Sequence, residues 1–418
     1  MLRSAMDVVT YALLFASLYF EVFLLVSFLE KRAERRAARA KRGASAAPEP
    51  ALPSAAIVVP CFNEERGVAS TLESLLALEY PAGRLELIVV DDGSRDRTLA
   101  IARSLEGVRR GIPVRVFAKE NGGKHTAMNL ALEHTNAELI GCLDADSVVD
   151  ARALRRIARV FENREVAAVT PGIHVRAPET ILQHMQNVEY RLSVFNRFML
   201  SALGSAFVAP GPFSVFRASV VRELGGWRHG HSTEDMELAL RIQAAGHLIA
   251  NAPGAAVHTT APRTLRQLFN QRVRWTYGFL RNAADYRYML ANRAYGNLGI
   301  LVLPLALVSI GAALYFFARI VLSAAHAIIA TYTRIELTGL FPHPSLELYY
   351  VNTSAMWFLV WIAVALILVL VGTGSRIGGK KTLPLGTPLF VLFYSLLVPL
   401  WLGTALVRAV FKTGVSWR

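Results

Sequence analysis

The sequence predicts a doubly wound α/β domain with a mostly parallel sheet, placed between apolar helices that cross a membrane. Hydrophobic residues make up 53% of the 418 residues and charged residues only 18%, and the mean hydropathy is +0.36. Long apolar runs lie near both ends of the chain, and short apolar runs alternate with helical patterns between them. This combination argues against a disordered chain, a coiled coil and a simple cytosolic enzyme.

The first apolar run covers residues 8–29 and is interrupted only by Glu21. As a helix it would be about 33 Å long, enough to span a bilayer. A basic cluster, residues 31–42, comes after the run instead of before it, which favours a permanent anchor over a signal peptide. We therefore expect an anchor at 1–30, a basic and Pro/Ala-rich linker at 31–54, and a cytoplasmic location for residues 31–290.

The C-terminal region, 291–418, is predicted to contain about three membrane helices. The apolar runs there are 298–325, 353–373 and 387–410. Counting the crossings places the C-terminus outside, whereas Arg408, Lys412 and Arg418 favour the inside. Either the last run crosses fully, or Pro399 breaks it into a re-entrant element.

Residues 55–262 alternate between strand and helix patterns. Five continuous apolar runs are typical of strands buried on both faces of a parallel sheet: 55–60, 85–90, 114–117, 138–143 and 166–170. Helical patterns lie between them, at 66–78, 96–107, 123–135 and 150–163. Asp96 and Asp150 stand where N-caps are expected. In such a sheet, ligands bind beyond the carboxyl ends of the strands.

Carboxylates come directly after three of these predicted strands. They are Glu64 and Glu65 after the first, Asp91 and Asp92 after the second, and Asp144 and Asp146 after the fourth. An Asp in such a place can be only a cap or turn former. Three groups at one edge repel one another, so they predict a bound cation or a substrate that offers donors.

Asp144 and Asp146 alternate along an extended segment and therefore point the same way. Two such carboxylates suit one hard cation such as Mg²⁺, which would in turn bind a diphosphate. Gly122-Gly123-Lys124 opens a predicted helix, so its N–H groups and Lys124 are candidates to meet phosphate or a base.

Two later segments carry further candidates. Asp235 precedes a helical pattern and is either a cap or a general base. Gln271, Arg274 and Trp275 share roughly one side of a helix, where Arg suits a diphosphate and Trp a sugar ring. His229 and His231 are interpreted as polar loop residues, and Cys61 and Cys142 as small core residues rather than metal ligands or a disulfide framework.

The ordered set of motifs resembles membrane-embedded family 2 glycosyltransferases. It resembles most the processive β-polysaccharide synthases, which make poly-N-acetylglucosamine, chitin, hyaluronan or cellulose. The resemblance covers about residues 55–280 and the flanking helices, and implies a GT-A fold and inverting transfer from a UDP-sugar. The motifs are VVPCFNEE, VVDDGS, GGKHTAMN, DAD, TED and QRVRW.

The resemblance also implies roles for individual residues. Asp92, with Asp91 beside it, would contact uracil, and Lys124 would support the nucleotide. Asp144 and Asp146 would bind the diphosphate and Mg²⁺ or Mn²⁺. Asp235, next to the substrate-binding Glu234, would deprotonate the acceptor hydroxyl. The diphosphate would be covered, and the floor of the acceptor site formed, by Gln271, Arg274 and Trp275.

In such enzymes amphipathic helices lie along the membrane, and 180–200 and 264–280 fit that description, the latter within an interfacial segment at 263–290. The implied partners are a UDP-sugar donor, a glycan or lipid acceptor and membrane lipid, with an accessory subunit or a homo-oligomer as further partners. The implied location is the cell membrane.

Three interpretations compete: a processive polysaccharide synthase, a transferase that adds one sugar to a lipid, and a channel or assembly subunit that only binds the nucleotide sugar. The net charge of +14 also suits nucleic acid. Because the basic residues concentrate beside the first apolar run, anionic lipid explains them better, and we expect no nucleic-acid partner.

Overall fold

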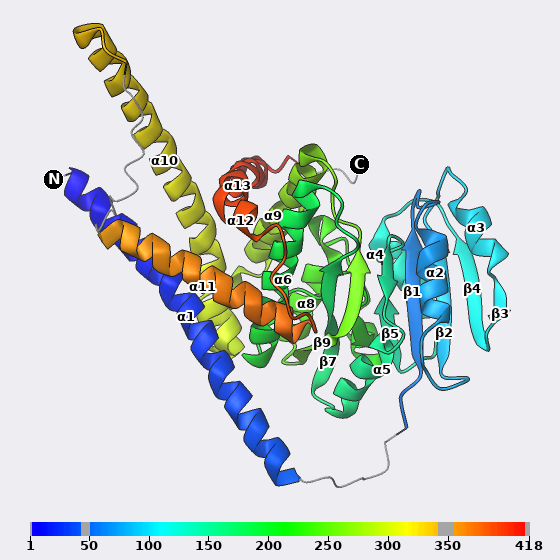
Figure 1. The fold of residues 1–418 in the computed structure, drawn as a ribbon. Helices are drawn as coiled ribbons and strands as arrows, with labels where there is room; N and C mark the ends of the chain where they lie inside the picture. Colours follow the sequence, from blue (N-terminus) through cyan, green and yellow to red (C-terminus); the bar gives the residue numbers. More distant parts are fainter. Residues whose placement is uncertain (1, 43–50, 342–354, 414–418) are drawn as a thin grey trace.

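The computed structural model describes residues 2–42, 51–341 and 355–413, and Figure 1 shows their arrangement. The helices are α1 (Leu2–Arg42), α2 (Val68–Leu76), α3 (Thr98–Ser104), α4 (Lys124–Glu133), α5 (Ala153–Ala158), α6 (Ile181–Ala202), α7 (Ala218–Glu223), α8 (Glu234–Ala244), α9 (Leu265–Asp285), α10 (Leu303–Thr338), α11 (Ala355–Ile377), α12 (Thr387–Leu389) and α13 (Ser395–Phe411). The strands are β1 (Ala55–Cys61), β2 (Leu85–Asp91), β3 (Gly107–Arg109), β4 (Ile112–Ala118), β5 (Leu139–Cys142), β6 (Ser147–Val149), β7 (Val166–Val175), β8 (Val215–Arg217) and β9 (Leu248–Thr259).

The strands form one sheet in the order β3-β4-β2-β1-β5-β8-β7-β9-β6. The pairs β1–β2, β1–β5, β2–β4 and β7–β9 are parallel, so the predicted mostly parallel sheet is confirmed. The pairs made by β3, β6 and β8 are antiparallel. These three strands and β9 were not predicted, because each of the first three has only three residues and β9 contains Pro253 and Gly254.

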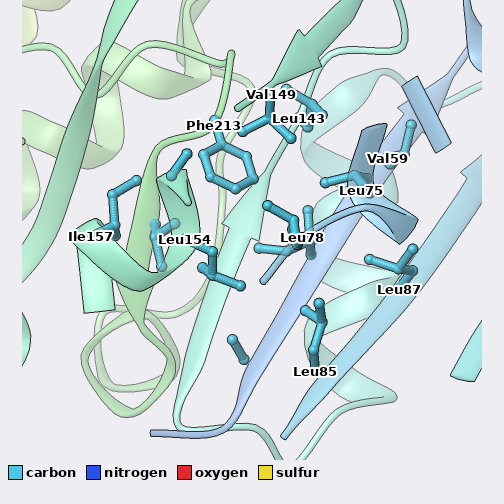
Figure 2. Close-up of a cluster of buried hydrophobic side chains, with 14 of the residues drawn as sticks. Val59, Leu75, Leu78, Leu85, Leu87, Leu143, Val149, Leu154, Ile157 and Phe213 are labelled. Carbon is cyan, nitrogen blue, oxygen red and sulfur yellow. The ribbon is translucent and has the colours of Figure 1, made fainter. Parts of the chain in front are cut away.

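Alternate residues of β1 enter two hydrophobic layers, one on each face of the sheet. Ile57 and Val59 pack with α2 and α5, and Figure 2 shows that layer, with Val59 near Leu75. Ala56 and Val58 pack in the other layer with α4, α7 and α8. Burial on both faces is the reason that these strands are continuous apolar runs in the sequence.

The helices between the first strands lie where the sequence predicts them, but two predicted caps are displaced. The N-cap of α3 is Arg97 and that of α5 is Arg152. Asp96 lies one residue earlier and still accepts from the N–H of Thr98 at 3.0 Å. Asp150 accepts from the N–H of Arg152 at 2.9 Å. Each aspartate therefore lies just before its helix and accepts a hydrogen bond from a backbone N–H at the N-terminal end of that helix.

Helices α6 and α9 join the sheet to the long apolar helices. Each begins with a capping box, Thr180 with Gln183 and Thr264 with Gln267. Helix α6 packs against β7, β9 and α11, and α9 packs against α13. In Figure 1 both lie between the sheet and the helices α1, α10 and α11. The catalytic candidates are thus held close to the apolar part of the chain.

Four helices of the described residues are long and apolar enough to cross a membrane: Asp7–Ala33, Leu298–Thr338, Trp357–Ile377 and Thr387–Phe411. The second extends past the predicted end at 325, because the helix continues to Thr338 through a further apolar segment. The break suggested at Pro399 does not occur, since α13 continues through that residue. Helix α1 continues to Arg42, so residues 31–42 are helical; 43–50 of the predicted linker lie outside the described residues.

Candidate active site

The loops after β1 and β2 hold each other at the predicted edge of the sheet. The N–H of Asn63 donates to Ser94 Oγ at 2.9 Å, and the N–H of Arg95 donates to Asn63 Oδ1 at 2.8 Å. Asn63 has φ 55°, a left-handed conformation that Asn tolerates better than most residues. These bonds fix the position of Asp91 and Asp92 between the two loops.

Asp92 organises the glycine turn before α4. It is 4% exposed, and Oδ1 accepts from Lys119 Nζ at 2.6 Å and from the N–H of Gly122 at 3.0 Å. Its Oδ2 accepts from the N–H of Gly123 at 2.8 Å. Asp91 is also buried; one oxygen accepts from the N–H of Ser94, and the other has no partner among the described residues. The predicted uracil contact of this pair stays a prediction.

Lys124 connects three of the predicted motifs. From the first residue of α4, its Nζ reaches Asp144 Oδ1 at 2.5 Å and Glu234 Oε1 at 3.7 Å. Burial is the largest single effect on Lys124 and lowers its pKa, but the nearby negative groups, Asp144 foremost and then Cys142 and Glu234, together outweigh it and raise the pKa well above its ordinary value. The glycine turn, the end of β5 and the start of α8 therefore form one site.

Gly211 leaves room beside this ion pair. A Cβ at position 211 would lie 2.9 Å from both carboxylate oxygens of Asp144 and closer still to Lys124 Nζ. Any side chain there would displace the pair. Gly211 was not predicted as a site residue, although the Pro210-Gly211-Pro212 segment is a loop signal in the sequence.

Asp144 and Asp146 lie beyond β5 as predicted, and both are partly exposed. Burial, and then the negative charge of Asp144, raise the pKa of Asp146 to about 6. Ser147 Oγ donates to Asp146 at 2.9 Å. Two partly exposed carboxylates that repel each other fit a divalent cation. No group of three or more His, Cys, Asp or Glu residues suited to a metal occurs among the described residues, so substrate oxygens or water would complete its coordination.

Asp235 lies in the first turn of α8. Burial, together with the smaller effect of the Glu234 charge, raises the pKa of Asp235 to about 6. One of its oxygens accepts from the N–H of Met236 at 2.8 Å. Thr233, not Asp235, holds the N-cap position. Asp235 is half-buried, and a carboxylate whose pKa has moved toward neutrality is suited to act as a general base.

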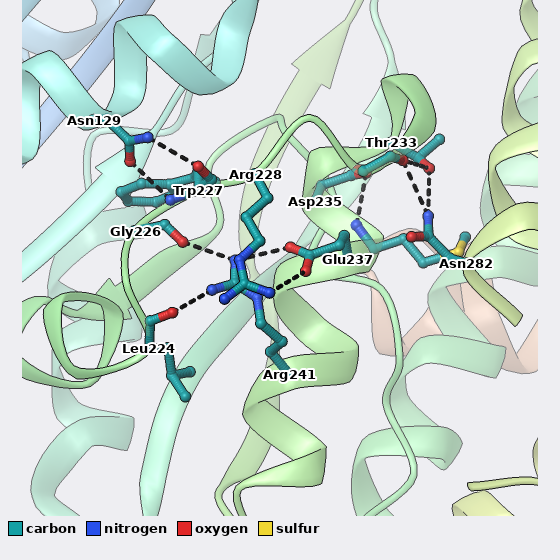
Figure 3. Close-up of polar contacts among 12 residues, drawn as sticks. Asn129, Leu224, Gly226, Trp227, Arg228, Thr233, Asp235, Glu237, Arg241 and Asn282 are labelled. Atoms are coloured by element: carbon teal, nitrogen blue, oxygen red, sulfur yellow. Dashed lines mark hydrogen bonds and ion pairs between the residues drawn. The ribbon is translucent and has the colours of Figure 1, made fainter. Parts of the chain in front are cut away.

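The start of α8 is held by buried polar contacts, which Figure 3 shows. Asn282 of α9 donates to Thr233 Oγ1 at 2.9 Å, and Arg241 pairs with Glu237 at 2.8 Å. Gly278 of α9 faces Thr233 so closely that a Cβ there would lie 2.9 Å from the Thr233 Cβ. Asn129 of α4 exchanges two bonds with the backbone of Trp227, at 2.7 and 2.8 Å. Sequence reasoning missed these partners, because only the fold brings them together.

The QRVRW segment lies in α9, and Arg274 points toward the acidic cluster. Its NH1 donates to the carbonyl of Ser232 at 3.2 Å. Burial lowers the pKa of Arg274, while the charges of Glu234, Asp235 and Asp144 act in the opposite direction. Gln271 Oε1 is buried without a partner among the described residues, and Trp275 is 38% exposed. The structure therefore brings Arg274 to the site and leaves the Trp275 ring accessible.

Comparison with known proteins places these features in a family. Residues 53–278 match the family described as "Glycosyltransferase like family 2". A poly-beta-1,6-N-acetyl-D-glucosamine synthase of Staphylococcus aureus (strain COL) is 31% identical over 221 residues, which are 52% of this chain and 52% of that protein. The synthase of the same name from Staphylococcus epidermidis is 32% identical over 222 residues, with the same coverage. The matched segments span about half the length of these curated relatives.

Among solved structures, the mannosyltransferase PcManGT from Pyrobaculum calidifontis, in complex with GDP-Man and Mn²⁺, is similar over nearly the whole chain. The TM-score is 0.61 at 18% identity, and the match covers 98% of this chain and 99% of that one. This likeness confirms the GT-A fold.

Proposed function

Because this chain belongs to the family 2 glycosyltransferases, we propose that it is an inverting enzyme that transfers a sugar from a UDP-sugar to a growing β-linked polysaccharide. The observation that supports it most directly is the position of Lys124, which joins the Asp144 carboxylate to the Glu234–Asp235 turn. Donor and acceptor groups thereby face one site. The synthase relatives favour a polymer product over the two other interpretations.

The donor side is formed by the loops beyond β1, β2 and β5. The glycine turn held by Asp92 presents the N-terminal end of α4, whose N–H groups favour negative charge. Lys124 and Arg274 supply positive charge for the diphosphate. Asp144 and Asp146 would hold Mg²⁺ or Mn²⁺, which supplies charge neutralisation for the departing UDP. Apart from this, substrate binding and proton transfer are carried out by residues of the chain alone.

On the acceptor side, Asp235 takes the proton of the acceptor hydroxyl. The acceptor oxygen then bonds to the anomeric carbon of the donor sugar while the bond from that carbon to the β-phosphate oxygen breaks. UDP leaves with the bonding electrons, and the configuration at the anomeric carbon inverts. Trp275 offers its exposed ring to the apolar face of the acceptor sugar.

Replacing Trp275 with Ala should weaken the acceptor site and shorten the product. Loss of one aromatic platform is worth about 1 kcal/mol, so we expect the acceptor KM to rise by roughly fivefold to tenfold. Binding of UDP should persist, because Lys124, Asp144 and Asp146 lie on other elements and Arg274 of α9 is left unchanged. The measurement is the size distribution of product labelled from the correct UDP-sugar, found by testing a panel of donors.

Trp275→Phe is the matched control, since it retains an aromatic face and should keep most of the product length. If the wild-type enzyme forms only a lipid carrying one sugar with every donor, the synthase proposal is wrong and the single-transfer interpretation replaces it. If no donor is consumed at all, the binding-subunit interpretation gains support instead.

We propose that the protein lies in the cell membrane with its catalytic domain in the cytoplasm. The proposed division is an anchor at 1–30, a basic segment at 31–54, the catalytic domain at 55–262, an interfacial segment at 263–290 and the C-terminal helices at 291–418. The basic cluster after the first apolar run supports this orientation. An accessory subunit or a second copy of the chain remains part of the proposal as a partner in the membrane.

The orientation can be tested with two single cysteines placed on opposite sides. Val108, in β3, is 72% exposed, and Leu337, near the end of α10, is 79% exposed. In whole cells an impermeant thiol reagent should label Leu337→Cys and leave Val108→Cys unlabelled until the cells are opened. The native Cys61 and Cys142 do not interfere, because both are buried and burial raises the pKa of both thiols. Rapid labelling of Val108→Cys in intact cells would reverse the proposed orientation.

A further inference from the structure

Arg272 is the one charged residue of the QRVRW segment that the proposed chemistry leaves without a role. It precedes Trp275 by three positions on α9, so the two side chains are neighbours on the helix surface. The guanidinium carbon of Arg272 lies 4.3 Å from the centre of the Trp275 ring. This distance is well within the range of a cation–π contact. Arg274, by contrast, points toward Ser232 and the acidic cluster.

The guanidinium of Arg272 is itself fixed from outside its helix. Its NH2 donates to Glu189 Oε2 of α6 at 2.6 Å. The same oxygen accepts from the hydroxyl of Tyr394 at 2.6 Å. Tyr394 belongs to the π-helical segment Phe390–Tyr394 that leads directly into α13. One carboxylate oxygen therefore joins an arginine beside the acceptor platform to a predicted membrane span.

Arg272 is buried, and its ion pair with Glu189 satisfies only part of its guanidinium. The residue is only 4% exposed, and its Nε and NH1 have no partner among the described residues. A purely structural ion pair is expected to satisfy more of such a buried group. Here one edge of the guanidinium is held by Glu189, and its face is left for the indole ring of Trp275.

We propose that Arg272 is a positioning residue that holds the Trp275 ring in place for the acceptor sugar, and that Glu189 and Tyr394 anchor it to the membrane helices. The inference rests on the proposed function, because it assigns the acceptor to Trp275. It goes beyond that function in linking the acceptor platform mechanically to the segment before α13. A shift of that segment would move Arg272, and with it the ring on which the acceptor rests.

The test is a double-mutant cycle on full-length enzyme, with the acceptor that the wild type uses. Arg272→Lys keeps the charge for Glu189 but removes the planar group that stacks on the indole. We expect the acceptor KM to rise about fivefold, with the UDP-sugar KM and kcat within about twofold of wild type. In a Trp275→Ala background the same change should add less than about twofold, because the ring through which Arg272 acts is absent.

The chain offers a matched control between the same two helices. Arg263 and Glu179 form an exposed ion pair of 2.8 Å where α9 and α6 begin, with side chains 61% and 63% exposed. Arg263→Lys should leave the acceptor KM unchanged. A fivefold effect of Arg272→Lys that persists without Trp275, or an equal effect of Arg263→Lys, would show that Arg272 only joins the helices and would overturn the proposal.

Tyr394→Phe keeps the test decisive if Arg272→Lys fails to fold. It removes one hydroxyl and retains the ring contacts with Phe390 and Trp401, at 5.0 and 5.8 Å between centroids. A rise of about twofold in acceptor KM that disappears with Trp275→Ala supports the link, and no rise at all refutes it. The product class is measured separately by size. A single-sugar product would therefore contradict the synthase proposal. The double-mutant cycle would still test the role of Arg272, because the acceptor KM would then be measured with the lipid acceptor.

Discussion

Asp235→Asn should reduce turnover by at least about 10²-fold while UDP binding is retained. Inverting transfer needs a group that removes the acceptor proton on the side opposite the leaving UDP. Asn keeps the shape of the side chain and the bond from the N–H of Met236, but it cannot accept a proton at neutral pH. The loss should therefore appear in kcat, with little change in the KM for the donor.

The neighbouring carboxylate provides the matched control. Glu234 lies 3.7 Å from Lys124 Nζ and is only 8% exposed, so it is committed to the ion-pair cluster. Glu234→Gln should weaken donor binding through Lys124 rather than remove the base. If Glu234→Gln abolishes turnover and Asp235→Asn leaves it near wild type, the two roles are exchanged.

The pH profile offers a second check on Asp235. Its pKa is raised to about 6, chiefly by burial and then by Glu234. A base must be deprotonated to act, so kcat/KM should fall as the pH falls through about 6, instead of near the ordinary value for Asp of about 4. Saturating divalent metal should keep Asp146 ionised, so that the remaining acid limb reports on Asp235. A flat profile down to about pH 5 would contradict the assignment.

The part of the fold that could be predicted from the sequence is the part in which local pattern and burial agree. Strands β1, β2 and β5 are buried on both faces, so they are continuous apolar runs, and carboxylates stand directly where they end. Asp144 and Asp146 lie just beyond β5 for this reason, whereas Asp235 reaches the site from the first turn of α8. The short antiparallel strands gave no such pattern, because β6 and β8 have three residues each and depend on partners far away in the chain.

What could not be predicted depends on contacts between distant segments. Gly211 matters because its Cα faces Asp144, and Gly278 because its Cα faces Thr233. Glu189 has no motif around it, and its significance comes only from meeting Arg272, 83 positions away, and Tyr394, 205 positions away. A sequence pattern reports spacing along one element, whereas these residues are defined by the packing of several.

Chelation of divalent metal should abolish transfer, and Mg²⁺ or Mn²⁺ should restore it. Asp144 and Asp146 already repel each other, as the raised pKa of Asp146 shows, with burial its larger cause. A diphosphate brings at least about two more negative charges to the same place, and each close pair costs on the order of 1 to 4 kcal/mol. Lys124 offsets part of this charge, but it is shared between Asp144 and Glu234.

Direct binding of Mn²⁺, monitored by its paramagnetic resonance signal, separates this role from other effects of the chelator. Two carboxylates alone should bind Mn²⁺ weakly, and UDP should tighten the binding at least about tenfold by supplying phosphate oxygens. Asp146→Asn should lose that gain. Asp150→Asn should keep it, because Asp150 lies outside the site and its carboxylate accepts from the N–H of Arg152 at the start of α5. Full activity in excess EDTA, or Mn²⁺ binding that UDP and Asp146→Asn leave unchanged, would show that the two aspartates serve the diphosphate without a metal.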